Sequence, residues 1–538
     1  MITLGVNYGI AASHDPSACL VDDRGEVLAY VEQERVSRRK HAPGEVPLDA
    51  IWHVLETSQV HREDVTDVAV GWDEPALRHR IRGDHHSAVV KDTLTDLGWE
   101  MRGNRPAVHF IEHHTAHAYS ALYSSPFDDC NIVVADGNGE EQSTSIFRAS
   151  RERRQVTLLE SWPRAQSLGY MFEATSRWLG LGMMGAGQTM GLAAYGKSLV
   201  QPSPTETRWV DEGALLPTVL GTDPSLDYNE LIQQWLVLIE DRFGPRPTVH
   251  RSELHTLPSA VAAAWQAQRS VEEALANLTS YVRRLTGIDA VAFAGGVALN
   301  CAAIGALSGD RFTPPVPHDA GVALGAAWAI TPPAKSQFPW SPYLGARAGT
   351  RENETHGFRW ADADPSRIAD LIAGGAVGGI FTSRAEVGPR ALGHRSILSS
   401  ASESEVKDRL NRLKRREPWR PFGPITDDLE QGLWHDVRPL DLYMAGATTM
   451  TSRGLRDVPA GAHVDNTTRP QVVSDHVDPL VQAVLAGTRE RGLPALINTS
   501  FNDHDEPIVN SADGAVRTAS QLGLDFVVIG EDLGERDA

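Results

Sequence analysis

Residues 131–139, with the sequence NIVVADGNG, decide the predicted fold. They combine an apolar strand, the acid Asp136 at its end and a glycine-rich loop directly after it. The chain opens with a similar pattern at 2–8, ITLGVNY, where an apolar run passes into the polar loop 9–16. Short apolar runs bounded by turn residues are typical of buried strands. Two copies of one motif therefore predict an internal duplication.

Both copies continue with the same kinds of element. Turn residues at 22–25 join two strand patterns into a hairpin in the first copy. The predicted strands lie at 17–21, 26–32, 67–72, 107–111, 143–149 and 155–161, and the predicted helices at 47–60, 87–97 and 113–123. Paired hairpins of this type clamp phosphates in actin-like and sugar-kinase-like ATPases. We therefore expect an α/β chain that begins with an actin-like ATPase fold.

Composition excludes several classes of protein. The chain has 538 residues, 41% of them hydrophobic, which is a globular balance rather than a disordered one. It carries 50 Lys and Arg against 70 Asp and Glu, a net charge of −20. An acidic surface argues against a nucleic-acid partner, because phosphate backbones attract basic faces. Cys19, Cys130 and Cys301 lie far apart, so neither a disulfide framework nor a thiolate zinc site is expected.

The sequence also predicts a cytoplasmic protein without a membrane segment. Its first residues lack the basic start of a secretion signal and read at once as a strand. The stretch 290–309 is free of charge and long enough to span a bilayer. It contains Gly295, Gly296 and Asn300, however, and so reads better as a strand, a glycine turn and a buried helix.

A linker is predicted at 331–355, which is rich in Pro, Ser, Gly and Arg. We expect it to join an N-terminal domain, 1–345, to a C-terminal one, 346–538. Ten Lys and Arg residues then lie between 384 and 420, which indicates a local anion site in an acidic chain. A basic run is usually a solvated helix face. This run passes into the apolar turn 419–422, so some of its arginines are predicted to point inward.

A metal site is predicted around His113 and His117. Residues four apart project from one face of a helix, so both imidazoles can bind one ion, although an isolated pair is more often solvated or capping. Asp136 ends a buried strand, where a lone acid is costly, and Asp319 precedes an Ala- and Gly-rich helix and could be a fourth ligand. Two imidazoles and two carboxylates suit Fe(II), Mn(II) or Zn(II) equally.

Phosphate-binding candidates lie in both parts of the chain. The glycine turns Gly137, Gly139, Gly295 and Gly296, with Asn300, could place backbone amides against a nucleotide, although close packing of a strand on a helix needs the same residues. In the C-terminal part, guanidinium forks and polar amides suggest a second phosphate pocket. Its candidate residues are Arg390, Lys414, Arg416, Arg420, Asn498, Ser500 and Asn502.

His14 lies in the first polar loop, where an actin-like fold aims residues at a terminal phosphate. A neutral histidine there could take a proton from a substrate hydroxyl. A histidine that merely caps the loop accounts for the sequence equally well.

These motifs resemble the NodU/CmcH family of carbamoyltransferases, TobZ-like enzymes that tailor antibiotics and other natural products. The resemblance runs nearly end to end and is carried by many ordered motifs. They lie at 5–7 with His14, 34–35 with 40–41, His113 with His117, 135–137, 167–169, 190–193, 295–300, 343–345, 388–393, 416–417 with 420–422, 463–465 with Arg469, 498–502 and 506–509.

The resemblance implies an N-terminal domain like the tRNA threonylcarbamoyltransferase, which is actin-like, and a YrdC-like C-terminal domain. The YrdC-like domain would join carbamoyl phosphate to ATP, with Mg(II), to give carbamoyl adenylate and pyrophosphate, and Arg469 would belong to this pocket. The intermediate would move internally to an iron site formed by His113, His117, Asp136 and Asp319. There His14 would activate an acceptor hydroxyl, and AMP would leave.

Three positions depart from the family pattern: Gln188 stands where Lys is usual, Ile304 where Asn is frequent, and Asp505 where Gly is usual. None of them is a predicted metal ligand. We expect a small hydroxylated acceptor and a monomer or homodimer. The apolar content of 208–251, including Trp209, Trp235 and 215–220, slightly favours a macrolide or glycosylated polyketide over an aminoglycoside, cephem or ansamycin.

Two other functions are compatible with parts of the sequence. A hydrogenase-maturation type of carbamoyltransferase acts on a protein cysteine, but it would be expected to carry acylphosphatase and cysteine zinc modules. A non-enzymatic nucleotide sensor would leave the four metal ligands and the second phosphate pocket unexplained. A natural-product O-carbamoyltransferase accounts for both sites.

Overall fold

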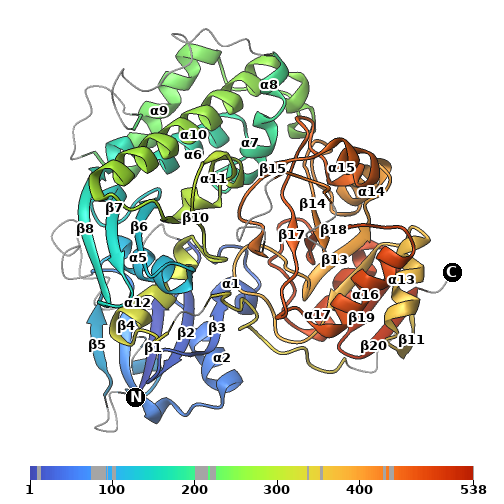
Figure 1. The fold of residues 1–538 in the computed structure, drawn as a ribbon, viewed down its shortest axis with the longest axis horizontal. Helices are drawn as coiled ribbons and strands as arrows, with labels where there is room; N and C mark the ends of the chain where they lie inside the picture. Colours follow the sequence, from blue (N-terminus) through green and yellow to red (C-terminus); the bar gives the residue numbers. More distant parts are fainter. Residues whose placement is uncertain are drawn as a thin grey trace.

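The computed structural model consists of three main sheets and the helices packed on them (Figure 1). Two sheets come from the N-terminal part of the chain and the third from the C-terminal part. The structure describes residues 1–8, 14–73, 93, 95–99, 105–199, 216–217, 226–335, 338–351, 356–427, 432–435 and 442–536.

The first sheet has five strands in the order β3-β2-β1-β4-β5. Their bounds are β1 Ile2–Asn7, β2 Ser17–Asp22, β3 Val27–Glu32, β4 Val65–Val70 and β5 Ala107–Phe110. β1, β2 and β3 pair antiparallel, whereas β4 and β5 continue from β1 in parallel. Helix α2, Leu48–Ser58, packs on β2 and β3, and α12, Val322–Ile330, packs on β1. β1 is buried almost throughout, as its continuous apolar run indicates.

The second sheet repeats this design, in the order β10-β9-β6-β7-β8. Its strands are β6 Asp129–Ala135, β7 Gln142–Ser150, β8 Gln155–Pro163, β9 Val291–Ala294 and β10 Arg311–Phe312. β6, β7 and β8 are antiparallel, and β9 and β10 extend from β6 in parallel. Strand order and direction match those of the first sheet, so the predicted duplication is confirmed.

Two helices connect the duplicated sheets. Helix α5, His113–Ser124, packs on β6 and β9 and also against α12. The two helix backbones approach so closely that a Cβ on Gly325 would lie 1.7 Å from the carbonyl oxygen of Ala116. Only glycine fits there. The Ala- and Gly-rich composition of α12 therefore serves close helix packing, and it fixes α5 in the position that its histidines require.

The upper helices in Figure 1 belong to the second half of the duplication. They are α6 Leu168–Trp178, α7 Ala186–Ala193, α8 Gly196–Leu199, α9 Tyr228–Phe243, α10 Pro258–Thr286 and α11 Cys301–Ala306. The long helix α10 contacts α6, α7, α8, α9 and α11. It begins with Pro258 at its first turn and ends at Gly287, whose φ of 72° is the left-handed stop that glycine favours.

The third sheet has eight strands in the order β11-β20-β19-β12-β13-β18-β14-β17. Its strands are β11 Phe358–Asp362, β12 Gly378–Phe381, β13 Arg395–Ser400, β14 Gly423–Thr426, β17 Gln471–Val472, β18 Leu496–Ser500, β19 Phe526–Ile529 and β20 Asp532–Arg536. The helices of this part are α13 Pro365–Ala373, α14 Glu405–Leu413, α15 Ser452–Asp457, α16 Pro479–Glu490 and α17 Ala512–Leu522, and a small pair is formed by β15 Thr448–Thr449 and β16 Thr467–Thr468. The mixed sheet with its helices confirms an α/β class for this part as well.

Helix α1, Gln33–Ser37, joins the two parts of the chain. The buried Arg35 donates a hydrogen bond to the carbonyl oxygen of Gly388 at 2.6 Å. Arg38 donates to the carbonyl oxygens of Pro507 and Ile508 at 2.8 and 2.7 Å. The segment that follows α1 is therefore held between the N-terminal sheets and the C-terminal sheet.

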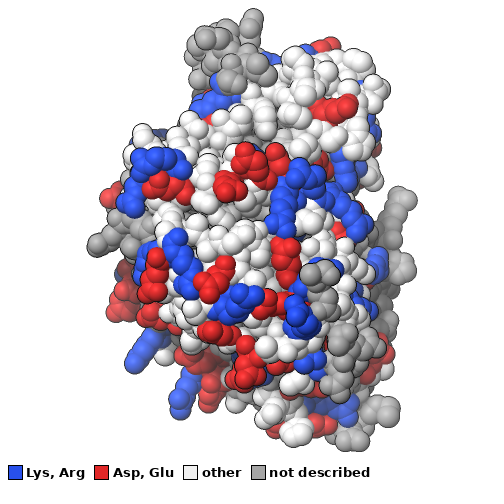
Figure 2. Space-filling view, turned by 90° about the vertical axis from the view of Figure 1, so that its right-hand side faces the viewer, with Lys and Arg blue, Asp and Glu red and all other residues white. Residues whose placement is uncertain are grey.

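Several other expectations can be compared with the structure. Within 331–335 and 338–351 the linker forms neither helix nor strand, as predicted. The stretch 290–309 forms β9, a glycine turn and α11, and among the described residues no helix is long and apolar enough to cross a membrane. The predicted helix at 87–97 lies largely outside the described residues. On the face shown in Figure 2, Lys and Arg residues are interspersed with Asp and Glu residues.

Candidate active site

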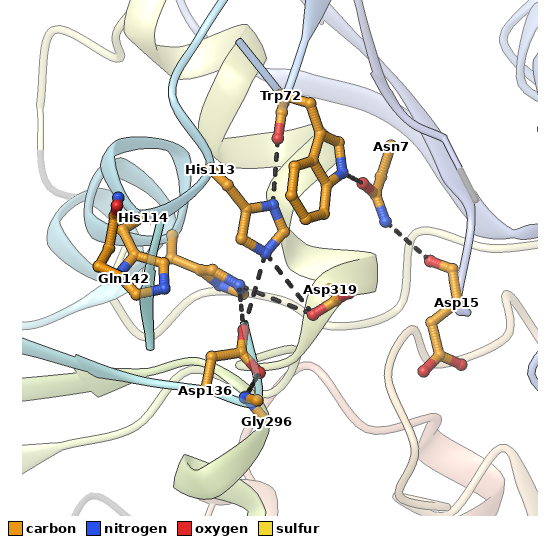
Figure 3. Close-up of polar contacts among 12 residues, drawn as sticks. Asn7, Asp15, Trp72, His113, His114, Asp136, Gln142, Gly296 and Asp319 are labelled. Carbon is orange, nitrogen blue, oxygen red and sulfur yellow. Dashed lines mark hydrogen bonds and ion pairs between the residues drawn. The ribbon is translucent and has the colours of Figure 1, made fainter. Parts of the chain in front are cut away.

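Four side chains converge on one buried point between the duplicated sheets (Figure 3). His113 and His117 lie one turn apart on α5, Asp136 follows β6, and Asp319 precedes α12. The Nε2 atom of His117 lies 3.1 Å from Asp136 Oδ2, and that of His113 lies 3.7 Å from the same oxygen. Asp319 Oδ1 is 3.8 Å from both Nε2 atoms. The structure thus brings together the four residues that the sequence predicted as ligands.

Local structure explains how the histidines reach this point. Glu112 caps α5 by accepting a hydrogen bond from the backbone N–H of Thr115 at 2.7 Å, so the helix begins at His113. The backbone N–H of His113 donates to the Glu140 carboxylate at 3.0 Å. These two hydrogen bonds fix the first turn of α5, and the side chains of His113 and His117 project from the same face of the helix.

The arrangement fits a divalent cation. The buried Nε2 of His113 has no hydrogen-bond partner. Asp136 Oδ1 accepts the backbone N–H groups of Gly137 and Gly296 at 2.8 and 3.1 Å, which leaves Oδ2 to face the imidazoles. One ligand atom from each of the four residues lies within 4.8 Å of the others. The donor set suits several transition metals and does not single out iron.

The pKa shifts of these residues also favour a bound cation. Burial lowers the pKa of His113, but the nearby Asp136 carboxylate and the charge of Asp319 outweigh this and raise the pKa to about 9. Burial raises the pKa of Asp319, and the neighbouring Asp136 charge raises it further. Burial also works against the charged form of Asp136, yet the two imidazoles hold its pKa well below the ordinary range. Two buried carboxylates repel each other, and a cation between them would relieve that repulsion.

Contacts around the ligands orient them. His113 Nδ1 lies 3.1 Å from the carbonyl oxygen of Gly71, and its ring stacks on the indole of Trp72 with centroids 3.8 Å apart. Such outer contacts fix the tautomer and the ring plane of a ligating histidine. No sequence motif pointed to Trp72 or Glu140 as part of this site. Trp72 lies two residues after the end of β4, and Asp136 directly follows β6; the carboxyl ends of parallel strands are where ligands bind in such sheets.

The predicted base His14 belongs to a second cluster. The Asp15 carboxylate lies between two imidazoles, 2.7 Å from His14 Nδ1 and 2.9 Å from His41 Nδ1. Burial lowers the pKa of His14, but its bond to Asp15 and the charges of Asp15, Asp319 and Asp136 raise it to about 10. Without a cation nearby, these charges favour the protonated imidazole, whereas the predicted role requires a neutral one. The contributions of Asp319 and Asp136, which lie far from His14 in the sequence, could not be read from the motif.

A basic cavity of about 610 Å³ lies beside this cluster. His41 and Lys40 line it, together with Arg251. All eight residues predicted for the C-terminal phosphate pocket line it as well: Arg390, Lys414, Arg416, Arg420, Arg469, Asn498, Ser500 and Asn502. A second cavity, of about 460 Å³, shares the four arginines of that set and continues towards α7, α10 and α11.

The predicted cations of the basic cavity are buried or half-buried, and they are crowded. Burial and the neighbouring charges of Arg416 and Lys40 hold the pKa of Lys414 well below its ordinary range. Burial, followed by the charge of Arg469, lowers the pKa of Arg390 to about 9. The prediction that some arginines of the basic run point inward is confirmed, since Arg416 and Arg420 line the cavity, and Lys414 beside them is 3% exposed. Mutual repulsion of buried cations creates a strong site for an anion.

The polar residues of the pocket have structural partners of their own. Lys414 Nζ donates to the Asn502 side chain at 2.9 Å and to the Ser500 carbonyl oxygen at 2.5 Å. The Asn498 amide donates to the carbonyl oxygen of Ala391 and to the side chain of Gln471. In this structure these residues position the cations more than they offer free donors.

The predicted nucleotide-binding residues of the N-terminal part occupy two kinds of position. Gly137 and Gly296 donate their amides to Asp136, next to the metal ligands. Gly295 has a φ of 88°, and a Cβ there would lie 2.2 Å from the carbonyl oxygen of Ala135. Asn300 exchanges two hydrogen bonds with Gln268 and also caps α11. At Gly295 and Asn300 the geometry favours the packing and capping alternative. Gly139 sits against the ring of His114, 2.9 Å from where its Cβ would be.

The structure also shows where the three departures from the family pattern and part of the acceptor segment lie. Gln188 and Asp505 line the basic cavity, whereas Ile304 is fully buried in the core. Within the acceptor segment 208–251, Trp235 is fully buried in the core and does not line a pocket described here. That contradicts its use as an acceptor-facing residue. Residues 208–215 and 218–225, which include Trp209, lie outside the described residues.

Comparison with known proteins identifies the class. The family model "Carbamoyltransferase N-terminus" matches residues 78–328, and "Carbamoyltransferase C-terminus" matches 369–536. The nodulation protein NolNO of Sinorhizobium fredii is 33% identical over 97% of this chain and 78% of its own length. The 3'-hydroxymethylcephem-O-carbamoyltransferase of Amycolatopsis lactamdurans is 26% identical over 97% of this chain and 98% of its own.

Among solved structures, the activator of the 2-hydroxyisocaproyl-CoA dehydratase from Clostridium difficile with bound ADPNP is similar at 13% identity. It has a TM-score of 0.36 and covers 63% of this chain and 97% of that one. The family models and the relatives define the protein as an enzyme that transfers carbamoyl groups. The chain belongs to the carbamoyltransferase family.

Proposed function

We propose that this carbamoyltransferase is an ATP-dependent O-carbamoyltransferase with two separate sites. The basic cavity would form carbamoyl adenylate, and the four-ligand centre would pass its carbamoyl group to a hydroxyl. We assign the first reaction to a YrdC-like domain at 346–538 and the second to an actin-like domain at 1–345. One observation carries the proposal: buried cations line one cavity, while buried carboxylates and imidazoles gather at another point.

Adenylation uses the cations of the basic cavity. Water first releases orthophosphate from carbamoyl phosphate. An oxygen of the carbamate then attacks the α-phosphorus of ATP, the bond to the β-phosphate oxygen breaks, and pyrophosphate leaves with Mg(II). Arg390, Arg416 and Arg420 would bind the phosphate oxygens, and their charges would stabilise the negative charge that develops on the leaving pyrophosphate. Phosphate binding would also favour the protonated form of Lys414.

Transfer uses the other cluster. The acceptor oxygen attacks the carbamoyl carbon, the C–O bond to AMP breaks, and the hydroxyl proton passes to Nε2 of His14, whose Nδ1 is held by Asp15. A divalent cation, which we propose to be iron, would be held by His113, His117, Asp136 and Asp319, stabilise the leaving phosphate and offset the charges that keep His14 protonated. His41 contacts Asp15 and lines the basic cavity, so the two sites adjoin.

The acceptor is proposed to be a small hydroxylated natural product. The cephem-modifying relative supports this class. A macrolide or glycosylated polyketide remains our first choice, with aminoglycoside, cephem and ansamycin acceptors as the alternatives, although Trp235 no longer argues for it. We further propose a cytoplasmic monomer or homodimer that binds no nucleic acid.

Isotope exchange tests the adenylation step. The full chain is incubated with ATP, Mg(II), labelled pyrophosphate and carbamoyl phosphate, and label in ATP is counted. We expect incorporation only when carbamoyl phosphate is present, because pyrophosphate re-enters ATP only from the adenylate. Exchange without carbamoyl phosphate, or none at all, would refute the proposal. A panel of hydroxylated antibiotics is then screened by mass spectrometry for the gain of one carbamoyl group.

A further inference from the structure

Asn7 is a fully buried amide at the end of β1, between the metal centre and the His14 cluster (Figure 3). Its Oδ1 accepts the indole N–H of Trp72 at 3.0 Å, and its Nδ2 donates to the carbonyl oxygen of Asp15 at 3.2 Å. We propose that Asn7 is a positioning residue that couples the orientation of the ligand His113 to that of His14. This inference rests on the proposed function, in which both histidines act in the transfer step.

The metal side of the coupling runs through Trp72. The indole is 5% exposed and stacks on the His113 ring at an angle of 26°. The residue after β4 also fixes the His113 ring. The carbonyl oxygen of Gly71 contacts His113 Nδ1, and the Gly71 N–H in turn donates to the carbonyl oxygen of Val6. A tilt of the indole would therefore turn the imidazole. The hydrogen bond that the indole donates to Asn7 prevents this tilt.

The His14 side runs through the backbone of Asp15. This residue has a φ of 59°, a left-handed conformation that a non-glycine residue holds only when its surroundings fix it. Two contacts do so: its N–H donates to the carbonyl oxygen of His41 at 2.8 Å, and its carbonyl oxygen accepts from Asn7. Its carboxylate then reaches both His14 and His41. Release of the carbonyl would loosen the contact that orients His14.

The chemistry of the two partners requires an amide. An indole N–H can only donate and a backbone carbonyl can only accept, so the orientation of the Asn7 amide is forced. Aspartate could keep the contact with Trp72 but has no donor for Asp15. Leucine has the same branching at Cγ, with a larger side chain, and loses both bonds. N7D therefore removes only the hydrogen bond to Asp15, the His14 arm of the coupling. N7L also removes the hydrogen bond from Trp72, the metal arm.

Cobalt binding tests the metal arm without an activity assay. Full-length protein stripped of metal is titrated with Co²⁺, and the visible bands report affinity and geometry. We expect N7L and W72F each to weaken Co²⁺ binding about tenfold and to alter the bands, since outer partners of ligating histidines contribute about ten- to a hundredfold. The N7L/W72F double variant should be no weaker than either single variant. Wild-type binding in N7L, or additive losses in the double variant, would overturn the metal arm.

Chemical labelling tests the His14 arm. Diethyl pyrocarbonate modifies the neutral imidazole, and peptide mass mapping gives the rate at His14 relative to His109, which is similarly exposed and also bonded to a carboxylate. N7D and N7L should raise this ratio, about tenfold for each unit by which the pKa of His14 falls. W72F should leave the ratio unchanged. An unchanged ratio in both Asn7 variants would overturn this arm.

A matched control separates coupling from general destabilisation. Asn131 is equally buried, and its amide also donates to a backbone carbonyl, that of Ile288 at 2.8 Å. It lies at the opposite end of β6 from Asp136, so N131D should lower the melting temperature while Co²⁺ binding and His14 labelling stay at wild-type values. The same losses in N131D as in N7L would refute the coupling. None of these readouts needs adenylation, so a wild-type protein without pyrophosphate exchange would refute the proposed function alone.

Discussion

The four-ligand centre and the basic cavity are opposites in charge and similar in construction. At the centre, Asp136 and Asp319 are buried together and repel each other. In the cavity, the buried Lys414 is repelled by Arg416 and Lys40, and the half-buried Arg390 is repelled by Arg469. At each site the protein places like charges close together, which lowers the stability of the folded state. Each site therefore favours an occupant of the opposite sign: a metal cation in one and phosphate groups in the other.

The two sites differ in how they are fixed. The ligands of the centre sit at strand and helix ends of a duplicated framework, where backbone amides hold Asp136. Three cations of the cavity, Lys414, Arg416 and Arg420, sit on the turn after α14, and the carbonyl oxygens of Ser500 and Asn502 hold Lys414. A framework site is rigid and suits a metal with fixed geometry. A turn built on long side chains suits a larger, flexible anion.

Loss of a metal ligand should give the largest effect and should be confined to one site. H113A removes one of four ligand atoms, so metal binding should weaken by more than about a hundredfold, beyond what outer-partner losses produce. Pyrophosphate exchange should continue, because the basic cavity is untouched. Metal content and exchange are measured on the same preparation. The control is H114Q: His114 is also buried but bonds Ser145 and is not among the four residues.

Loss of a cavity arginine should give the next largest effect, with the opposite pattern. R390A should lower carbamoyl-phosphate-dependent exchange by about a hundred- to a thousandfold, as expected when one stabilising donor is removed from a developing charge. Metal content should stay at the wild-type value. Arg415 offers a matched control, because it is exposed and pairs with Asp503. If H113A and R390A abolish the same half-reaction, the division into two sites is wrong.

Much of the centre could be predicted because its signals are local. The spacing of His113 and His117 encodes a shared helix face, and a strand that ends in Asp136 encodes a buried acid. The duplication was visible because both copies keep short apolar strands at similar intervals. Trp72 was missed because an aromatic residue after a strand is usually core, and only the meeting of strand ends shows that it faces His113.

The rest depends on contacts between distant segments. Asn300 looked like a phosphate contact, but Gln268 on α10 engages its amide. Trp235 looked like part of an acceptor surface, but α9 turns it into the core. The raised pKa of His14 depends first on Asp15, the next residue, and then on Asp319 and Asp136, which follow it by more than a hundred residues. No window of sequence contains such information.

The smallest effect is expected at the His14–Asp15 contact, which lies between the two sites. The pKa of His14 is raised from 6.5 to about 10, so the stability that this contact contributes is fully present below pH 6.5 and is lost as pH rises through 10. Asp15 has a lowered pKa, and its contribution is lost only in acid, below its ordinary value of 3.8. The melting temperature of D15N should therefore fall below that of the wild type by about 1–3 °C at pH 6 and by less at pH 10.

His14 is 34% exposed at its side chain, so solvent screens the contact and keeps this difference small. H14Q supplies the second measurement, because it removes the imidazole and leaves the Asp15–His41 contact in place. If D15N and H14Q both lie below the wild type by the same amount at pH 6 and pH 10, the protonated pair does not exist. His14 would then be neutral even without a metal ion, and metal binding would have no effect on its protonation state.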